Sequence, residues 1–288
     1  LAALAGRQEA WLYCTGRAAM VVGLQAIRDV ASSPERREVI IPAYTCYSVP
    51  AAVRLAGLLT RLCDVSPSTL SYDLAALRRM DTSRAVAIIS ANLYGLPNDL
   101  AALQAFANER GLRMFDDAAQ AMGATIDGRP AGGFGDLGLY SFDKGKNITS
   151  MEGGALMASA PELRNAIAAR NGALPPASVA HAVKTAAKLL AYSLLLRPGL
   201  YGAATHLPLG LGRTPYEEHF RISAYSPMLA GAPHLLFSRL DELRHGREMN
   251  AQRILRALEG CRQISAPQLL PAAAPAWARL PVFATDPS

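Results

Sequence analysis

The sequence is poor in lysine. Of its 29 basic residues only four are lysines, at positions 144, 146, 184 and 188, and the other 25 are arginines. Guanidinium stays protonated, whereas a lysine amine can lose its proton and attack a carbonyl, so a lysine in such a chain is a candidate nucleophile. Lys144 and Lys146 lie together in YSFDKGKNITSMEGG, residues 140–154. Two ordinary loop lysines are the alternative, and composition alone favours neither interpretation.

Disulfide and metal motifs are also lacking. The four cysteines, Cys14, Cys46, Cys63 and Cys261, form no CxxC pair, which favours a reducing, cytoplasmic location over a disulfide framework. All five histidines follow residue 180, with no HExxH and no carboxylate at ligand spacing. The sequence therefore predicts no metal site.

No hydrophobic run is long enough to span a membrane. The most apolar stretch, 188–202, has eight uncharged residues between Lys188 and Arg197, far fewer than the roughly 20 that a spanning helix needs. We expect a buried or interface helix there, with attachment to a membrane surface as the alternative. The net charge of +6 suits an anionic substrate, but the arginines are scattered and form no basic arm, so no nucleic-acid partner is expected.

Short apolar runs alternate with amphipathic stretches from residue 10 to about 160. This alternation predicts an α/β fold, a mostly parallel sheet with helices on both faces, in which ligands bind at the carboxyl ends of the strands. For the helix at 98–111, Asn98 is the candidate N-cap and Gly111 the C-terminal stop. The expected strands are at 37–44, 59–65, 84–95 and from 112 onward, and the other helices at 17–31 and 48–57.

Three regions are expected along the chain. Residues 1–172 form a large domain, 173–236 an atypical helical connecting segment, and 237–288 the start of a smaller C-terminal domain. The last region opens with an amphipathic helix at 238–260 that carries Leu240, Leu243, Met249, Leu255 and Leu258 on or near one face. The chain starts at Leu1 and ends in a strand-like run, so we expect that both ends are cut and that the C-terminal domain is incomplete.

One motif matches a nucleotide-binding pattern but lacks the structural context that the pattern requires. GFGDLG, residues 133–138, matches the GxGxxG pattern of dinucleotide-binding folds. That fingerprint requires a strand before it and a helix after it, but here a turn precedes it and a strand-like run follows. The glycines are more simply explained by a tight turn.

Three candidate sites remain. Asp116 and Asp117 follow a hydrophobic strand, where a carboxylate serves as a base, a partner of a ligand nitrogen, or simply a helix N-cap. A strand runs through Thr15, Gly16 and Arg17 into a helix, which makes a junction suited to phosphate. The third is the strand ending at Ser141, followed by Lys146 and Thr149.

Together the three sites offer a phosphate cradle, a carboxylate and an amine. Pyridoxal phosphate needs these three things: an anchor for its phosphate, a carboxylate beside its ring nitrogen and a lysine for its aldehyde. No metal or hydride cofactor explains the set as well.

The chain resembles the DegT/StrS-type sugar aminotransferases, which are fold type I enzymes that use pyridoxal phosphate. The resemblance covers most of residues 10–260 and includes IIPAYTCYSVPAAVRLAG, ANLYGLPNDLAAL and MFDDAAQAMGA. Its most specific part is the pattern S-F-x-x-x-K-x-[IL]-T-x-x-E-G-G, which is met by Ser141, Phe142, Lys146, Ile148, Thr149, Glu152, Gly153 and Gly154.

The resemblance implies a role for each site residue. Lys146 is expected to bind the cofactor covalently, whereas Lys144 has no covalent role. Asp117 pairs with the ring nitrogen, and Gln120 lies near the phenolic oxygen. The remaining implied cofactor-binding residues are the phosphate ligands Thr15, Gly16, Arg17 and Ser141, together with Cys46, which stands where the family usually has an aromatic residue stacked on the ring.

The resemblance also implies a function. It predicts transamination of a nucleotide-linked keto sugar with an amino-acid donor, glutamate, in polysaccharide synthesis by a homodimer. A lysine at 146, in place of the histidine of related dehydratases, favours transamination. Ile222 and Ala224 stand where the family usually has the asparagine and arginine that reach the partner's phosphate. The alternatives are a fold type I enzyme acting on another amine or amino acid, and a non-catalytic member that binds pyridoxal phosphate as a regulator or scaffold.

Overall fold

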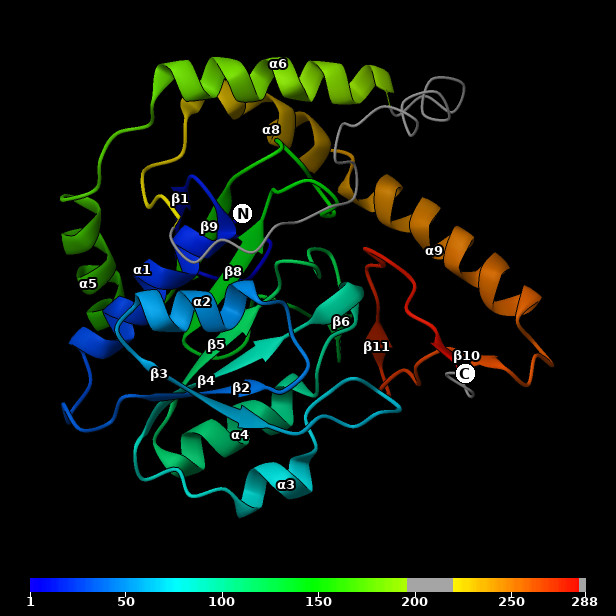
Figure 1. The fold of residues 1–288 in the computed structure, drawn as a ribbon, viewed down its shortest axis with the longest axis horizontal. Coiled ribbons are helices and arrows are strands. Elements are labelled where there is room, and N and C mark those ends of the chain that lie inside the picture. The colour runs from blue at the N-terminus through cyan, green and yellow to red at the C-terminus, as the bar shows by residue number, and fades with distance from the viewer. Residues whose placement is uncertain (196–219, 285–288) are drawn as a thin grey trace.

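The computed structural model describes residues 1–195 and 220–284, and its centre is a seven-stranded sheet (Figure 1). The strand order across the sheet is β1-β9-β8-β5-β4-β2-β3. The strands are β1 Glu9–Tyr13, β2 Glu38–Pro42, β3 Leu59–Cys63, β4 Ala85–Ala91, β5 Arg113–Asp117, β8 Leu137–Ser141 and β9 Gly154–Ala158.

The sheet is mixed but mostly parallel, which confirms the α/β prediction. β2 pairs in parallel with β3 and β4, β4 with β5, and β5 with β8. Only β9 runs the other way, between β1 and β8. The carboxyl ends of β1, β2, β4, β5 and β8 therefore meet at one edge of the sheet, beside the start of β9.

Helices cover both faces of the sheet. Neighbouring residues of a strand point to opposite faces, so Val39 and Ile41 of β2 lie in one core cluster and Ile40 in the other. The first cluster is covered by α1, α2 and α5, and the second by α3 and α4 (Figure 1). The helices are α1 Gly16–Asp29, α2 Ser48–Leu55, α3 Leu74–Arg79, α4 Leu100–Arg110 and α5 Pro161–Asn171.

Helix α1 lies against the sheet at a glycine. A Cβ placed on Gly23 would lie 2.7 Å from the Phe115 ring and 2.9 Å from Leu156 Cδ1. Real Cβ atoms do not approach so closely, so the missing side chain is what lets the helix axis come near β5 and β9. This approach fixes where α1 begins, at the edge where the parallel strands end.

The C-terminal part of the chain returns to the part that contains the seven-stranded sheet. After α6 (Val179–Leu195), η2 (Pro227–Leu229) and α8 (Gly231–Phe237), the helix α9 (Leu240–Ala257) leads outward (Figure 1). The chain then comes back, and β11 (Ala273–Ala274) pairs with β6 (Thr125–Ile126), which also pairs with β7 (Arg129–Pro130). A short pair, β10 (Ile264–Ser265) and β12 (Phe283–Ala284), closes this part. The division into three regions stays a prediction.

Two local expectations were wrong. Asp99, not Asn98, caps α4, because the Asp99 carboxylate accepts a hydrogen bond from the Ala102 N–H at 3.0 Å. Asn98 is buried instead, and its side chain donates to the Ala91 carbonyl at 2.8 Å, so it joins α4 to β4. On α9, Met249 faces solvent, while Leu240 and Ala251 form the buried side.

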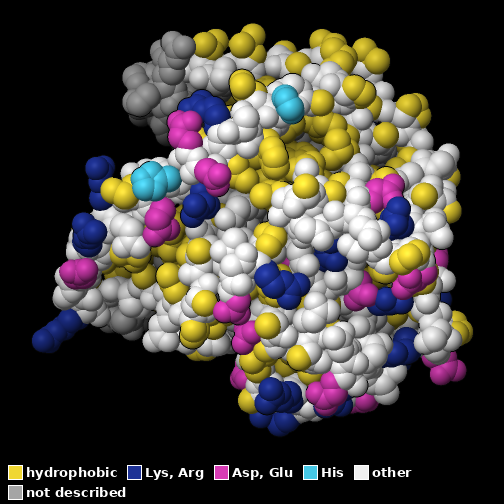
Figure 2. All heavy atoms as spheres, turned by 180° about the vertical axis from the view of Figure 1, so that it is seen from behind, with side chains coloured by type: hydrophobic (Ala, Val, Ile, Leu, Met, Phe, Trp, Pro, Cys, Tyr) yellow, Lys and Arg dark blue, Asp and Glu magenta, His cyan; other side chains and the backbone are white. Residues whose placement is uncertain are grey.

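Helix α6 is largely exposed. None of residues 188–195 is buried, so the buried form of the expected helix is wrong for this part, and an interface helix stays a prediction; residues 196–202 lie outside the described residues. Four large hydrophobic side chains of α6 are exposed, namely Val179, Val183, Leu190 and Leu194. Hydrophobic side chains also gather along the top of the molecule in Figure 2. Among the described residues no helix combines the length and apolarity needed to cross a membrane.

Replacing Gly23 with alanine should lower the free energy of unfolding by about 1–3 kcal/mol, because the new methyl group overpacks the contact with the sheet. Gly246, in the interior of α9 with no atom within 4 Å of an added Cβ, is the matched control. There the same change should raise the free energy by about 0.5–1 kcal/mol through helix propensity. Urea unfolding measures both, and a Gly23→Ala variant as stable as the parent protein would contradict the close approach.

Candidate active site

A cavity of about 260 Å³ lies where the parallel strands end. It brings together all eight residues to which the resemblance assigns a role at the cofactor, although they come from four separate segments. These residues are Thr15, Gly16, Arg17, Cys46, Asp117, Gln120, Ser141 and Lys146. Their positions agree with a shared site, and the role assigned to each one stays a prediction.

The N-terminus of α1 forms one end of the cavity. Thr15 caps the helix, and its Oγ1 accepts a hydrogen bond from the Ala18 N–H at 3.0 Å. A Cβ on Gly16 would lie 3.0 Å from Ser141 Oγ, and a Cβ on Gly154 would lie 2.5 Å from the Gly16 Cα. Three backbone segments therefore converge at the positive end of a helix, with a hydroxyl beside them, in an arrangement that suits a phosphate.

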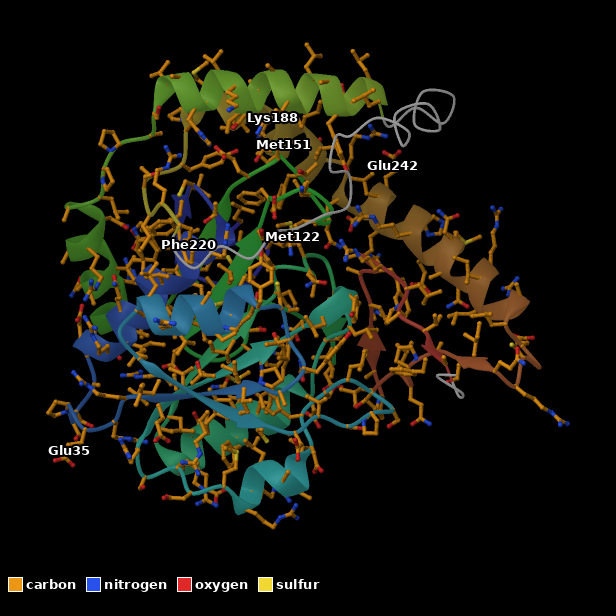
Figure 3. The ribbon with its side chains drawn as sticks, viewed as in Figure 1. Glu35, Met122, Met151, Lys188, Phe220 and Glu242 are labelled. Atoms are coloured by element: carbon orange, nitrogen blue, oxygen red, sulfur yellow. The ribbon has the colours of Figure 1, made fainter. Side chains whose placement is uncertain are left out.

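Arg17 is held at this end by an aromatic ring. Its guanidinium carbon lies 4.7 Å from the centre of the Phe220 ring, within the range of a cation–π contact. Figure 3 labels Phe220. Phe220 follows the undescribed residues 196–219, and no motif in the sequence indicates it. The ring orients the arginine while its charge faces the cavity that it lines.

The two aspartates have different environments. Asp116 is fully buried and accepts four hydrogen bonds, two on each carboxylate oxygen, from Ser90 Oγ, Asn92 Nδ2 and the N–H groups of Gly132 and Phe134. Asp117 lines the cavity, and its Oδ1 accepts one bond, from the Ala119 N–H at 2.9 Å. Asp117 is thus the carboxylate available to a ligand.

The two lysines also differ. Burial raises the pKa of Asp117 to about 6, and the nearby positive charge of Lys146 opposes this rise. Lys146 is half-buried and its charge also acts on Asp143, whereas Lys144 is exposed and acts on Asp143, whose carboxylate accepts a bond from the Lys144 backbone N–H at 2.8 Å. Of the two lysines, Lys146 is the one whose charge acts on the Asp117 carboxylate.

The cavity wall contains residues that the sequence analysis did not name. Gln120, which was named, accepts a hydrogen bond from the Tyr94 N–H at 3.0 Å, and this bond fixes its side chain at the wall. The residues missed include Met20, Ser48, Leu139, Asp143 and Arg279. Asp143 lies inside the lysine motif and could have been found there, but Arg279 lies in no recognisable motif.

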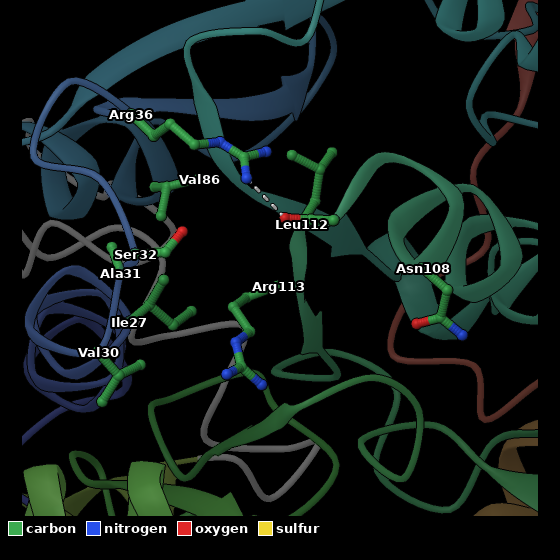
Figure 4. A pocket seen from close by; sticks show the side chains of 10 residues that line it. Ile27, Val30, Ala31, Ser32, Arg36, Val86, Asn108, Leu112 and Arg113 are labelled. Atoms are coloured by element: carbon green, nitrogen blue, oxygen red, sulfur yellow. Dashed lines mark hydrogen bonds between the residues drawn. The ribbon is translucent and has the colours of Figure 1, made fainter.

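A larger cavity, of about 380 Å³, lies at the opposite edge of the sheet (Figure 4). Its two arginines are already engaged: Arg36 donates to the carbonyls of Ala85, Arg110 and Gly111, and Arg113 pairs with Asp136 and Glu162. Its described lining includes no lysine, cysteine or carboxylate. We therefore place the chemistry at the smaller cavity. No cluster of metal-ligating side chains occurs within the described part of the chain.

Residues 1–183, more than half of the chain, match the model of the DegT/DnrJ/EryC1/StrS aminotransferase family. The chain belongs to this family. As expected for a DegT/StrS member, it is similar to a UDP-N-acetyl-3-dehydro-alpha-D-glucosamine 3-aminotransferase of Acidithiobacillus ferrooxidans, with 37% identity over 123 residues, 43% of this chain and 33% of the relative.

Other relatives carry related names. A dTDP-4-dehydro-2,3,6-trideoxy-D-glucose 4-aminotransferase of Saccharopolyspora spinosa is 30% identical over 149 residues, 52% of this chain and 38% of the relative. The chain thus spans about a third of the length of the curated relatives that it matches. A solved aminotransferase from Psychrobacter cryohalolentis shares the fold, with a TM-score of 0.76 and 24% identity over 99% of this chain and 67% of the other.

The positions that depart from the DegT/StrS pattern have local partners in this chain. Ile222 packs against the core cluster under α1, and Ala224 forms a bridge with Tyr13 at the end of β1. Between them, Ser223 accepts a hydrogen bond from the Cys14 N–H through its carbonyl, at 3.0 Å. The segment therefore extends the edge of the sheet beside the phosphate end of the cavity.

The raised pKa of Asp117 predicts a pH dependence of stability. Its folded pKa of about 6 lies above the ordinary 3.8, so the folded protein holds the proton more tightly. As the pH rises from 4 to 6, the free energy of unfolding should therefore fall, by up to about 3 kcal/mol. Asp117→Asn cannot titrate but still accepts from Ala119, so the stability advantage of the parent over the variant should shrink across this range. Urea unfolding of the cofactor-free proteins measures it, and a constant difference would contradict the burial.

Proposed function

We propose that the protein is an aminotransferase that uses pyridoxal phosphate to move an amino group from an amino acid, glutamate, to a nucleotide-linked keto sugar. The observation that supports this most is the placement of Lys146 and Asp117 in one cavity with the N-terminus of α1. Family membership gives the reaction class, and the geometry supplies the groups that this class requires.

The residues of the cavity fit the cofactor. The cradle at Gly16, Ser141 and Gly154 has no room for an added Cβ, but its backbone and hydroxyl groups suit a phosphate. Pyridoxal phosphate, when bound, supplies the aldehyde that accepts the amino group and the ring that withdraws electrons from the reacting carbon. Asp117, largely ionised at neutral pH, is suited to hold a protonated ring nitrogen because the cation would offset its burial.

Lys146 would carry the proton transfer. Its amine would hold the aldehyde of the bound cofactor and, once released by the donor, would act as base and acid at the carbon that gains or loses hydrogen. Gln120 would hold a ring substituent, and Arg17 would hold the phosphate. Each turnover converts an amino acid and a keto sugar into a 2-oxo acid and an amino sugar, so no external oxidant is needed.

Relatives support a sugar as the amino acceptor. The Acidithiobacillus and Saccharopolyspora proteins are named for amination of UDP- and dTDP-linked dehydro sugars. A third relative, from Yersinia pseudotuberculosis and 32% identical over 126 residues, is named a GDP-4-keto-6-deoxy-D-mannose 3-dehydratase, so its name also refers to a nucleotide-linked keto sugar. The cationic residues Arg17, Lys144, Lys146 and Arg279 outnumber the carboxylates Asp117 and Asp143 at the cavity, which favours an anionic substrate.

A non-catalytic role is the second candidate. A relative from Geobacillus stearothermophilus, 35% identical over 127 residues, is named a pleiotropic regulatory protein. The departures at Cys46, Ile222 and Ala224 motivate the same idea for this chain. A regulator would bind the cofactor without passing its amino group on.

We further propose a homodimer in the cytoplasm that serves polysaccharide synthesis. The four cysteines are unpaired thiols, which supports a reducing location. The homodimer and the pathway rest on the family resemblance.

Borohydride reduction of the protein with pyridoxal phosphate should leave a covalent adduct on Lys146, located by peptide mass spectrometry. Lys146→Ala should abolish the adduct, because Lys146 is the lysine of the cavity whose charge acts on Asp117. Lys144→Ala, two residues away and exposed, is the matched control and should keep it. An adduct that persists in Lys146→Ala and disappears in Lys144→Ala would reverse the assignment.

The transfer itself is tested by half-reactions. Addition of L-glutamate to the loaded protein should change the absorption of the bound cofactor and release one 2-oxoglutarate per site. A nucleotide-linked keto sugar should then restore the original spectrum. Protein that takes up no cofactor would refute both functions, whereas protein that takes it up and responds to no amino donor would favour the regulator.

A further inference from the structure

Arg279 lies at the mouth of the cavity, although it is 133 residues from Lys146 in the sequence (279 − 146). Its guanidinium lies over the backbone next to the reactive lysine, since Arg279 Nη2 is 3.7 Å from where a Cβ on Gly145 would be. It also lies near Tyr94. Burial and Tyr44 raise the pKa of Tyr94 to about 12, and the positive charge of Arg279 opposes the rise.

The segment that carries Arg279 is fixed in place. The Ala276 N–H donates to the Gly95 carbonyl at 3.0 Å, and the Ala278 N–H donates to the Tyr94 carbonyl at 2.9 Å. On the other side, Asn147 Nδ2 donates to the Ala276 carbonyl at 2.8 Å. The segment therefore joins the loop after β4 to the loop that holds Lys146.

Two further contacts anchor the segment. Trp277 is 4% exposed and donates from its indole nitrogen to Glu248 Oε2 on α9 at 2.7 Å. Gly95 adopts φ +91°, and a Cβ there would lie 2.2 Å from the Ala276 carbonyl oxygen. The backbone before Arg279 is thus locked, while its side chain stays exposed at the cavity.

Arg279 forms no ion pair with a carboxylate among the described residues. Within residues 1–195 and 220–284, no side-chain hydrogen bond or ion pair engages its guanidinium. The other cations of the cavity differ: Arg17 contacts Phe220, and the charges of Lys144 and Lys146 act on Asp143. A guanidinium forms a planar fork that matches a carboxylate with two parallel hydrogen bonds.

We propose that Arg279 binds the α-carboxylate of the amino donor. This inference rests on the proposed function and names the residue that selects amino acids as its donors. In an α-amino acid the carboxylate is bonded to the same carbon as the amine, so it must lie close to Lys146, where the guanidinium is. The diphosphate of a nucleotide sugar is separated from the amine-bearing carbon by part of the ring, and it would extend farther from the lysine.

The test measures binding rather than turnover. The ligand is 2-methyl-L-glutamate, which has the α-carboxylate but no α-hydrogen to lose, and calorimetry follows its binding to the protein with and without added pyridoxal phosphate. Arg279→Gln should weaken binding roughly 10- to 100-fold by removing a charge-assisted pair. Arg279→Lys, which keeps the charge but loses the fork, should fall between the two.

Two controls separate this effect from a general loss. Arg253→Gln, on the exposed side of α9, should bind like the parent protein. 4-Aminobutyrate lacks the α-carboxylate, so the parent and Arg279→Gln should bind it alike. The absorption of bound pyridoxal phosphate should also be the same in both, because Arg279 is assigned no contact with it.

The same calorimetry is repeated with uridine diphosphate as the ligand. Three results would overturn the proposal: equal affinity of the parent and Arg279→Gln for 2-methyl-L-glutamate, no binding of 2-methyl-L-glutamate by the parent, or a loss of affinity in Arg279→Gln for uridine diphosphate alone. The last result would assign the arginine to the nucleotide. Failure of the proposed function is distinguishable from these. A protein that binds the ligand through Arg279 but transfers no amino group from glutamate would keep the carboxylate site and lose the aminotransferase.

Discussion

The buried carboxylate of Asp116 is the constraint on which the site depends. Burial alone raises its pKa, and four donors from β4, the loop after β4 and the 132–134 turn oppose that rise. A buried charge is tolerated only when it is satisfied in this way, so the three segments are held together at one edge of the sheet. The next residue, Asp117, then faces the cavity.

A second constraint is the lack of space around Gly16. The helix α1 approaches the sheet at Gly23 and begins between Ser141 and Gly154, where no Cβ fits. The phosphate end of the cavity is therefore built from backbone and one hydroxyl, while the reactive end is built from side chains on loops. Positive charge faces the cavity from both ends, at Arg17 and Arg279.

The sequence predicted the elements whose signals are local. The strands ending at Asp117 and Ser141 could be predicted because an apolar run stops at polar residues in each. The choice of Lys146 over Lys144 came only from the family resemblance. The sequence pattern alone could not separate the roles of Asp116 and Asp117, because neighbouring residues of a strand differ only in the face of the sheet to which they point. The N-cap of α4 was misplaced by one residue for a similar reason: Asn98 and Asp99 both suit a cap, and the burial of Asn98 decides between them. Arg279 could not be predicted from a local pattern, because its position depends on contacts with loops far away in the sequence.

A crystal structure of the protein grown with pyridoxal phosphate tests the central claim most directly. The account predicts continuous density from Lys146 Nζ into the cofactor, the ring nitrogen beside Asp117, and the phosphate between Ser141 and the start of α1. A cofactor bound elsewhere, or one joined to a different lysine, would contradict it.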